Sequence, residues 1–286
     1  MGIAAFEQLD VSLAESSFRT AMKIAQQMDG RRSYTARLAG GLLGEVLYEK
    51  GQIVEAERLL DDGFDLGPHA GAVDLKITRY VVGARIKAIR GDRSAAVQRL
   101  DEGARFSMQM QLPRLHSAIV NEAARLDLVL PSSDAQPEDL TYAERAEQVS
   151  GLDEAIAQYR EEAAIRGLVR TGSPANTDLA CQWAREWVER LADSERHRAA
   201  LRARRLLAGC LAASGRSEEA GKVLTEVIAR CSQAGLVRFL ADGGEHVMDT
   251  LQHIVDTDHP PTHPPHSSDV PRDFLLAALA ADAGLT

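Results

Sequence analysis

The sequence has 286 residues, of which 45% are hydrophobic and 26% are charged. This composition is typical of globular proteins and excludes intrinsic disorder for most of the chain. Aromatic residues make up only 5%, while alanine, leucine, arginine and glutamate are abundant. These four are strong helix formers, so the composition argues against an all-β fold.

The charge of the chain argues against nucleic acid as a direct partner. Lys and Arg number 33 against 42 Asp and Glu, a net charge of -9, so the surface as a whole repels polyanions. No apolar stretch approaches the roughly 18 to 20 residues of a membrane span, and the first residues do not resemble a secretory leader. Cys181, Cys210 and Cys231 form no CxxC pair, which indicates reduced, buried thiols. We therefore expect a cytoplasmic protein that does not bind membranes.

In chain order, the predicted elements are all helices. Pro, Gly and Ser mark the segments 131–137 and 171–174 as loops. The segment 259–268 is Pro-rich and predicts an extended linker. Apolar periodicity predicts helices over 12–28, 33–50, 53–66, 71–90, 93–109, 113–130, 138–149, 152–169, 175–192, 196–214 and 217–233, followed by an amphipathic stretch at 246–255 and a short helix at 272–283.

One sequence template recurs along the chain. Residues 48–60 align with 89–100, and the turn glycines Gly51 and Gly91 are 40 residues apart. A third copy covers 213–224, and a degenerate copy covers 9–18. A turn glycine can end one helix, Asp or Ser after it can cap the next, and a following alanine lets two helices approach closely. Since each hairpin exposes an apolar face that only a neighbour can cover, we predict an all-α, right-handed superhelical solenoid of antiparallel helix pairs.

The spacing of small and large residues resembles the tetratricopeptide repeat (TPR), although the units are longer than the usual 34 residues. The residues that carry this resemblance in one unit are Leu43, Gly44, Ala56, Leu60, Gly63 and Pro68. The run 235–244 is similar to a Gly-x-x-Arg-x-Phe-x-Asp-x-Gly closing motif, with Phe239 directly after Arg238. Together with Leu285-Thr286, this order resembles the sensor region of the large LuxR-type, maltose-activator-like bacterial transcription regulators.

This resemblance implies a domain organisation and a function. We expect a superhelical sensor domain over 1–256, a Pro/His-rich linker over 257–271, and a short helix over 272–286 that leads to a helix-turn-helix domain. An ATPase with a phosphate-binding loop is expected upstream of Met1. The implied function is to bind a small-molecule effector or a regulatory protein and to control these modules, with self-association on activation. The alternative is a free-standing TPR scaffold that holds a partner peptide or protein in its concave groove.

The sequence gives no specific catalytic, cofactor or metal motif, and we predict that the chain is not an enzyme. The run 215–223 is similar to a phosphate-binding loop, but five residues separate its glycines where four are needed, and Val223 replaces the Mg²⁺-binding Ser or Thr. His259, His263 and His266 lie among prolines that resist closing around one ion. A helical-repeat enzyme is therefore the weakest of the three hypotheses.

Candidate effector residues follow from the predicted architecture. The first helix of each stacked pair lines the concave groove, where polar and aromatic side chains face a ligand. An arginine-lined groove suits an anionic or hydroxylated effector. The candidates are Arg79, Tyr80, Arg85, His116, Asn121, Arg125, Trp183, Trp187 and Arg204.

Overall fold

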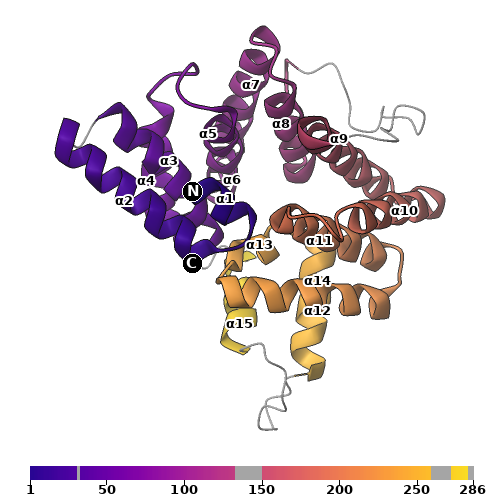
Figure 1. The fold of residues 1–286 in the computed structure, drawn as a ribbon. Coiled ribbons are helices and arrows are strands. Elements are labelled where there is room, and N and C mark those ends of the chain that lie inside the picture. Colours follow the sequence, from indigo (N-terminus) through magenta and orange to yellow (C-terminus); the bar gives the residue numbers. More distant parts are fainter. Residues whose placement is uncertain (31–32, 133–149, 259–271, 283–286) are drawn as a thin grey trace. The chain divides into compact units, whose positions relative to one another are not determined.

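The computed structural model describes residues 1–30, 33–132, 150–258 and 272–282. All regular structure in these ranges is helical, and successive helices form antiparallel hairpins (Figure 1). The elements are α1 (Gly2–Glu7), α2 (Val11–Asp29), α3 (Tyr34–Glu49), α4 (Ile53–Phe64), α5 (Val73–Ile77), the π-helix η1 (Thr78–Val82), α6 (Gly83–Ile89), α7 (Arg93–Gln109), α8 (Pro113–Leu126), α9 (Gly151–Arg170), α10 (Pro174–Arg190), α11 (His197–Ala213), α12 (Ser217–Ala234), α13 (Val237–Ala241), α14 (Glu245–Asp258) and α15 (Arg272–Asp282). The predicted fold class, an all-α TPR-like solenoid of helix pairs, is confirmed.

Most predicted helices are present, and the differences have local causes. The helix predicted over 113–130 ends at Leu126, because Asp127 adopts a left-handed φ of 52°. The sequence does not predict α1 and α13, since segments of 6 and 5 residues are too short for apolar residues to repeat at helical spacing. The helix predicted at 138–149, most of the 131–137 loop and the 259–268 segment lie outside the described residues.

The turns between paired helices follow the repeat template. Gly51, Gly91 and Gly215 have φ values of 81°, 81° and 77°, which side chains with a Cβ rarely adopt. Asp92 then caps α7, because its carboxylate accepts a hydrogen bond from the Ala95 amide at 2.9 Å. Gln52 and Arg216 are the N-cap residues of α4 and α12, but their side chains form no capping hydrogen bond. The expected side-chain capping therefore occurs in only one of these three hairpins.

The helices belong to two compact units, each with its own core. Unit 1 comprises Met1–Ile3, Leu13–Tyr48 and Gln52–Arg170. Its centre contains the fully buried side chains of Tyr80, Leu100, Leu115 and Ile119. Gly103 lets α7 approach these residues, since a Cβ at this position would lie 2.7 Å from the Tyr80 ring and 2.8 Å from Ile119.

Unit 1 also contains a helix that is interrupted by a π-turn. α5, η1 and α6 run continuously from Val73 to Ile89, with the wider turn at Thr78–Val82. This turn places Arg79 where its guanidinium donates to the carbonyl oxygens of Phe64 (2.5 Å) and Gly67 (2.7 Å). Arg79 thereby satisfies carbonyl groups at and beyond the end of α4.

Unit 2 comprises Ala4–Ser12, Glu49–Gly51 and Thr171–Thr286. Its core is built from α10, α11, α12 and α14, with Trp183, Leu224 and Leu251 buried. Arg198 of α11 attaches α1 to this core. Its guanidinium lies 4.1 Å from the centre of the Phe6 ring and forms an ion pair of 3.4 Å with Glu7.

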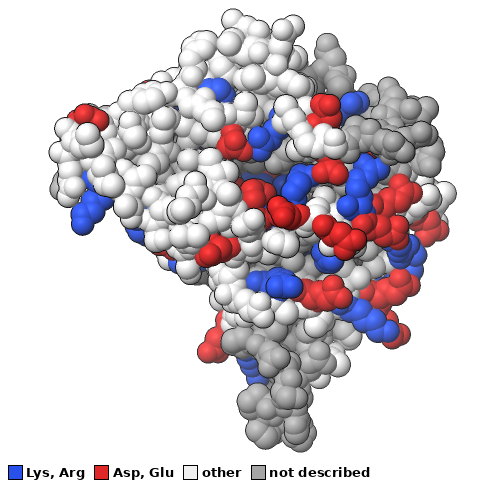
Figure 2. Space-filling view, viewed as in Figure 1, with Lys and Arg blue, Asp and Glu red and all other residues white. Residues whose placement is uncertain are grey.

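Positive and negative side chains are intermixed on the molecular face drawn in Figure 2, and no broad area of that face carries one sign. Many charged side chains of the described residues form ion pairs, such as Lys87 with Glu57 at 3.0 Å and Arg185 with Glu219 at 3.4 Å. Among the helices that the structure describes, none has the length and apolar character needed to cross a membrane.

Candidate functional site

Four of the predicted effector residues are almost completely buried. Arg79, Tyr80, Trp183 and Trp187 are exposed by 3% or less. Burial raises the pKa of the Tyr80 hydroxyl and lowers that of the Arg79 guanidinium. As folded, these side chains pack inside hairpins, and their contact with an effector stays a prediction.

Three other predicted residues, on α6 and α8, form hydrogen bonds with buried carboxylates. Arg85 binds the buried carboxylate of Glu122 through two hydrogen bonds of 3.0 and 2.8 Å, and Arg125 binds it at 2.6 Å. Burial alone would raise the pKa of Glu122, but the two guanidinium groups outweigh it and lower this pKa to about 2. Asn121 donates to Glu162 of α9 at 2.8 Å. Each of the three predicted residues therefore already has a carboxylate partner within unit 1.

His116 is the remaining predicted residue in unit 1. Its Nδ1 lies 3.1 Å from the Ser107 hydroxyl, and burial lowers the pKa of the imidazole. His116 therefore has a polar partner on the neighbouring helix α7, and its role toward an effector stays a prediction.

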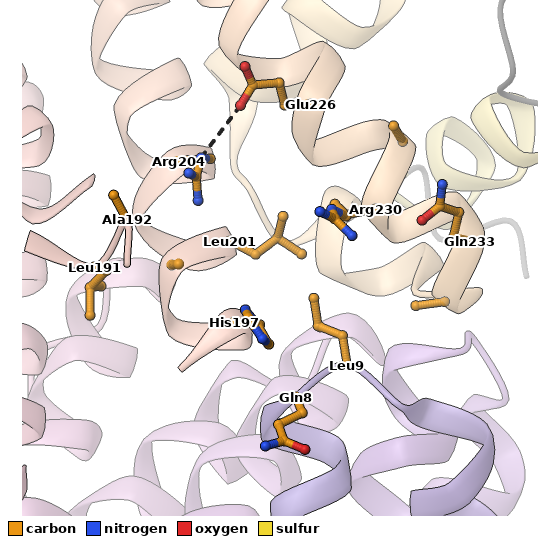
Figure 3. Close-up of a pocket in the computed structure, with 13 residues that line it drawn as sticks. Gln8, Leu9, Leu191, Ala192, His197, Leu201, Arg204, Glu226, Arg230 and Gln233 are labelled. Carbon is orange, nitrogen blue, oxygen red and sulfur yellow. Dashed lines mark ion pairs between the residues drawn. The ribbon is translucent and has the colours of Figure 1, made fainter. Parts of the chain in front are cut away.

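The last predicted residue, Arg204, lines a cavity of about 670 Å³ in unit 2 (Figure 3). This volume is within the range of ligand-binding pockets. The cavity is lined by Gln8, Leu9, Leu191, Ala192, His197, Ala200, Leu201, Arg204, Glu226, Ala229, Arg230, Gln233 and Ala234.

Helical periodicity explains how the lining residues come together. His197, Ala200, Leu201 and Arg204 follow the i, i+3, i+4, i+7 spacing that places side chains on one face of α11. Glu226, Ala229, Arg230 and Gln233 repeat this spacing on α12. Because α11 and α12 form a hairpin, these two faces converge on the cavity.

The cavity contains more positive than negative groups. Arg204 forms an ion pair with Glu226 at 3.5 Å, and the Glu226 side chain is 72% exposed. The described part of the chain offers the Arg230 and His197 side chains no hydrogen-bond or ion-pair partner. In Figure 3 the Leu201 side chain lies among Arg204, Arg230 and His197, so an apolar surface separates the polar groups.

The turn after α1 supplies another wall of the cavity. Leu9 holds a left-handed φ of 65°, which costs a residue other than glycine about 1 kcal/mol. Arg198 fixes this turn, since it contacts Phe6 and Glu7 just before it. The cavity therefore joins segments from both ends of the described sequence.

Sequence reasoning identified Arg204 but missed the rest of this cavity. The regular spacing on α11 and α12 is a signal that could have revealed His197, Arg230 and their neighbours. No local signal reveals Gln8 and Leu9, because α1 is too short to predict and reaches α11 through tertiary packing alone.

A second cavity, of about 430 Å³, lies in unit 1. Its two arginines are already engaged, since Arg37 donates to the Asp62 carbonyl at 2.8 Å and Arg58 pairs with the Asp62 carboxylate at 3.5 Å. It therefore offers a ligand fewer open polar groups than the cavity in unit 2.

The histidine motif lies outside the described residues, and the run 215–223 lies within them. No group of three or more His, Cys, Asp or Glu side chains in that part of the chain is placed to hold a metal ion. His259, His263 and His266 lie outside it. The run 215–223 forms the turn between α11 and α12, where Lys222 pairs with Glu218 at 2.7 Å.

The closing motif connects α11 with the last described helix. Arg205, next to Arg204, donates to the Phe239 carbonyl of α13. Arg238 pairs with Asp242 at 2.6 Å and donates to the Ala281 carbonyl at the end of α15 at 2.6 Å. A continuous set of contacts therefore leads from the cavity to α15 within unit 2.

Comparison with known proteins assigns the chain to a family. Residues 5–257 match the model of the MalT-like TPR region. Over 243 residues the chain is 40% identical to the proteins named Serine/threonine-protein kinase PknK of Mycobacterium tuberculosis (strain ATCC 25618 / H37Rv) and Mycobacterium bovis (strain ATCC BAA-935 / AF2122/97). This match covers 85% of the chain but only 22% of each relative. The chain belongs to the family of MalT-like TPR regions.

Proposed function

We propose that this chain is the sensor region of a large regulator and that its effector binds in the unit 2 cavity. The observation that carries the proposal is that α11 and α12 present His197 and Arg230 to the cavity, around the apolar side chain of Leu201. Neither His197 nor Arg230 has a hydrogen-bond or ion-pair partner in the described residues. Membership in the family of MalT-like TPR regions supports a regulatory role. The chain matches about a fifth of the length of each relative, and both relatives are named as protein kinases, so the matching region accompanies other parts of a larger protein.

The contacts that leave the cavity support a route for the signal. A ligand on Arg204 biases the position of α11, and Arg205 passes this bias to α13 through the Phe239 carbonyl. Arg238 continues the route to α15. In this proposal the effector acts by favouring one packing of α11, α13 and α15 over another.

Small-molecule capture tests the proposal. The chain is equilibrated with a cell extract that has been filtered to remove macromolecules, and retained compounds are identified by mass spectrometry. Ala229→Phe places a ring in the cavity, whereas Ala212→Phe on α11 changes an equally half-buried alanine outside it. Circular dichroism checks that both variants are folded.

We expect a compound that the native chain and Ala212→Phe retain and that Ala229→Phe loses. Equal retention by all three proteins, or retention of nothing, contradicts the proposal. If the chain instead retains peptides from an unfiltered digest, and Ala229→Phe retains them too, the result favours the alternative function, a scaffold for a partner peptide.

A further inference from the structure

The charges of the unit 2 cavity point to a chemical class of ligand. We propose that the cavity binds a small organic anion, whose carboxylate or phosphate is held by Arg230 and Arg204 and whose apolar part packs on Leu201 and Leu9. This inference rests on the proposed function, because it concerns the same cavity.

The argument begins with the charge balance. The cavity holds two guanidinium groups, Arg204 and Arg230, against the single carboxylate of Glu226, although the whole chain has a net charge of -9. A local excess of positive charge in an acidic protein favours an anion at this place.

The second step concerns which of these groups are available. Arg230 has no hydrogen-bond or ion-pair partner in the described residues. The Arg204–Glu226 pair is long, at 3.5 Å, and Glu226 is 72% exposed, so this pair contributes little and an anion can replace it. Guanidinium groups bind carboxylates and phosphates through paired hydrogen bonds.

The third step concerns the rest of the ligand. Leu201 lies between the two arginines in Figure 3, and Leu9 lies on the opposite wall. Gln8, His197 and Gln233 add further hydrogen-bonding groups to the lining. With a neutral hydroxylated ligand, water and Glu226 remain the only charged or strongly polar partners of the two guanidinium groups. An amphiphilic anion binds the two arginines through its charged group and packs its apolar part on the two leucines.

The proposal is tested by titrating the whole chain with matched probes while the NMR signals of α11 and α12 are monitored. The probes are hexanoate, hexanol and inorganic phosphate. Hexanoate and hexanol have the same alkyl chain but differ in charge. We expect hexanoate to bind at least about tenfold more tightly than hexanol, the effect of one charge-assisted hydrogen bond, and phosphate to compete with hexanoate.

Two variants locate the effect. Arg230→Gln is expected to weaken hexanoate binding about tenfold and to leave hexanol binding unchanged. Lys222→Gln, on the same helix but outside the cavity and 73% exposed, is expected to change neither.

Three results would overturn the proposal. They are equal binding of hexanoate and hexanol, an unchanged hexanoate affinity in Arg230→Gln, and no response to hexanoate or phosphate up to their solubility limits. If neutral compounds bind and Ala229→Phe abolishes this binding, the anion inference fails while the proposed function stands. If captured compounds are retained equally by Ala229→Phe, the proposed function itself fails.

Discussion

Glu122 is a buried carboxylate between two arginines, and this arrangement makes a pH-dependent contribution to stability. Its pKa in the folded chain, about 2, is below the ordinary value of 4.5. A lowered carboxyl pKa stabilises the fold above the unfolded-state pKa, and this stabilisation is lost as the pH falls from about 5 toward 2. The shift corresponds to a free energy on the order of 3 kcal/mol.

We therefore predict that Glu122→Gln lowers the free energy of unfolding at pH 7 by about 3 kcal/mol, because Arg85 and Arg125 lose their shared counter-charge. The difference between native and variant should shrink as the pH falls to 2. Urea unfolding across this pH range measures it, with Glu226→Gln as the exposed control. An identical acid dependence in Glu122→Gln and the native chain contradicts the assignment.

Two helical glycines provide a second test at the residue scale. Gly103→Ala should destabilise unit 1 by about 1–3 kcal/mol, because the new methyl group collides with the buried Tyr80 ring and Ile119. Gly221→Ala on α12 meets no atom within 4 Å and should stabilise the chain by about 0.5–1 kcal/mol through helix propensity. Thermal unfolding of both variants measures these changes, and a Gly103→Ala variant as stable as the native chain would show that the α7 packing is wrong.

At the scale of the helices, periodicity and turn glycines predicted most elements. The positive φ values of Gly51, Gly91 and Gly215 explain this success, because each glycine ends a helix by local chemistry. The π-turn at Thr78–Val82 could not be predicted in this way. The π-turn positions the Arg79 guanidinium to donate hydrogen bonds to the carbonyl oxygens of Gly67 and Phe64, which lie 12 and 15 residues earlier in the chain. Such contacts depend on tertiary packing.

The candidate site, too, is only partly predictable from local sequence patterns. The residue spacing on α11 and α12 predicts two walls of the cavity. The contribution of Leu9, in contrast, depends on contacts between α1 and α11, such as that of Glu7 with Arg198, which is 191 residues away in the chain. Arg85 and Arg125 are groove candidates because they are polar residues on predicted first helices, and a lone sequence does not show that Glu122 binds both of them.

The closing motif yields a prediction about α15. Arg238 is buried and donates to the Ala281 carbonyl, so Arg238→Met removes the bond that holds the end of this helix. We expect amide hydrogen exchange in α15 to become about tenfold faster or more, while α12 is unchanged. Arg272→Met, an exposed change on α15 itself, serves as the control. Equal exchange in both variants would remove Arg238 from the signal route.

At the scale of the whole molecule, the helices divide into two compact units, and within each unit neighbouring helices pack against one another. The cavity, α11, the closing motif and α15 all belong to unit 2. Binding and the proposed transmission of the signal therefore require no rearrangement of unit 1. The central claim is that occupancy of this cavity controls a larger protein.

The most direct test of this claim is the output of the intact protein encoded by the gene that contains this sequence. The regulated activity is measured with and without the captured compound for the native protein, Ala229→Phe and Ala212→Phe. We predict that Ala229→Phe keeps the basal activity but loses the response, whereas Ala212→Phe responds like the native protein. A full response from Ala229→Phe would contradict the claim.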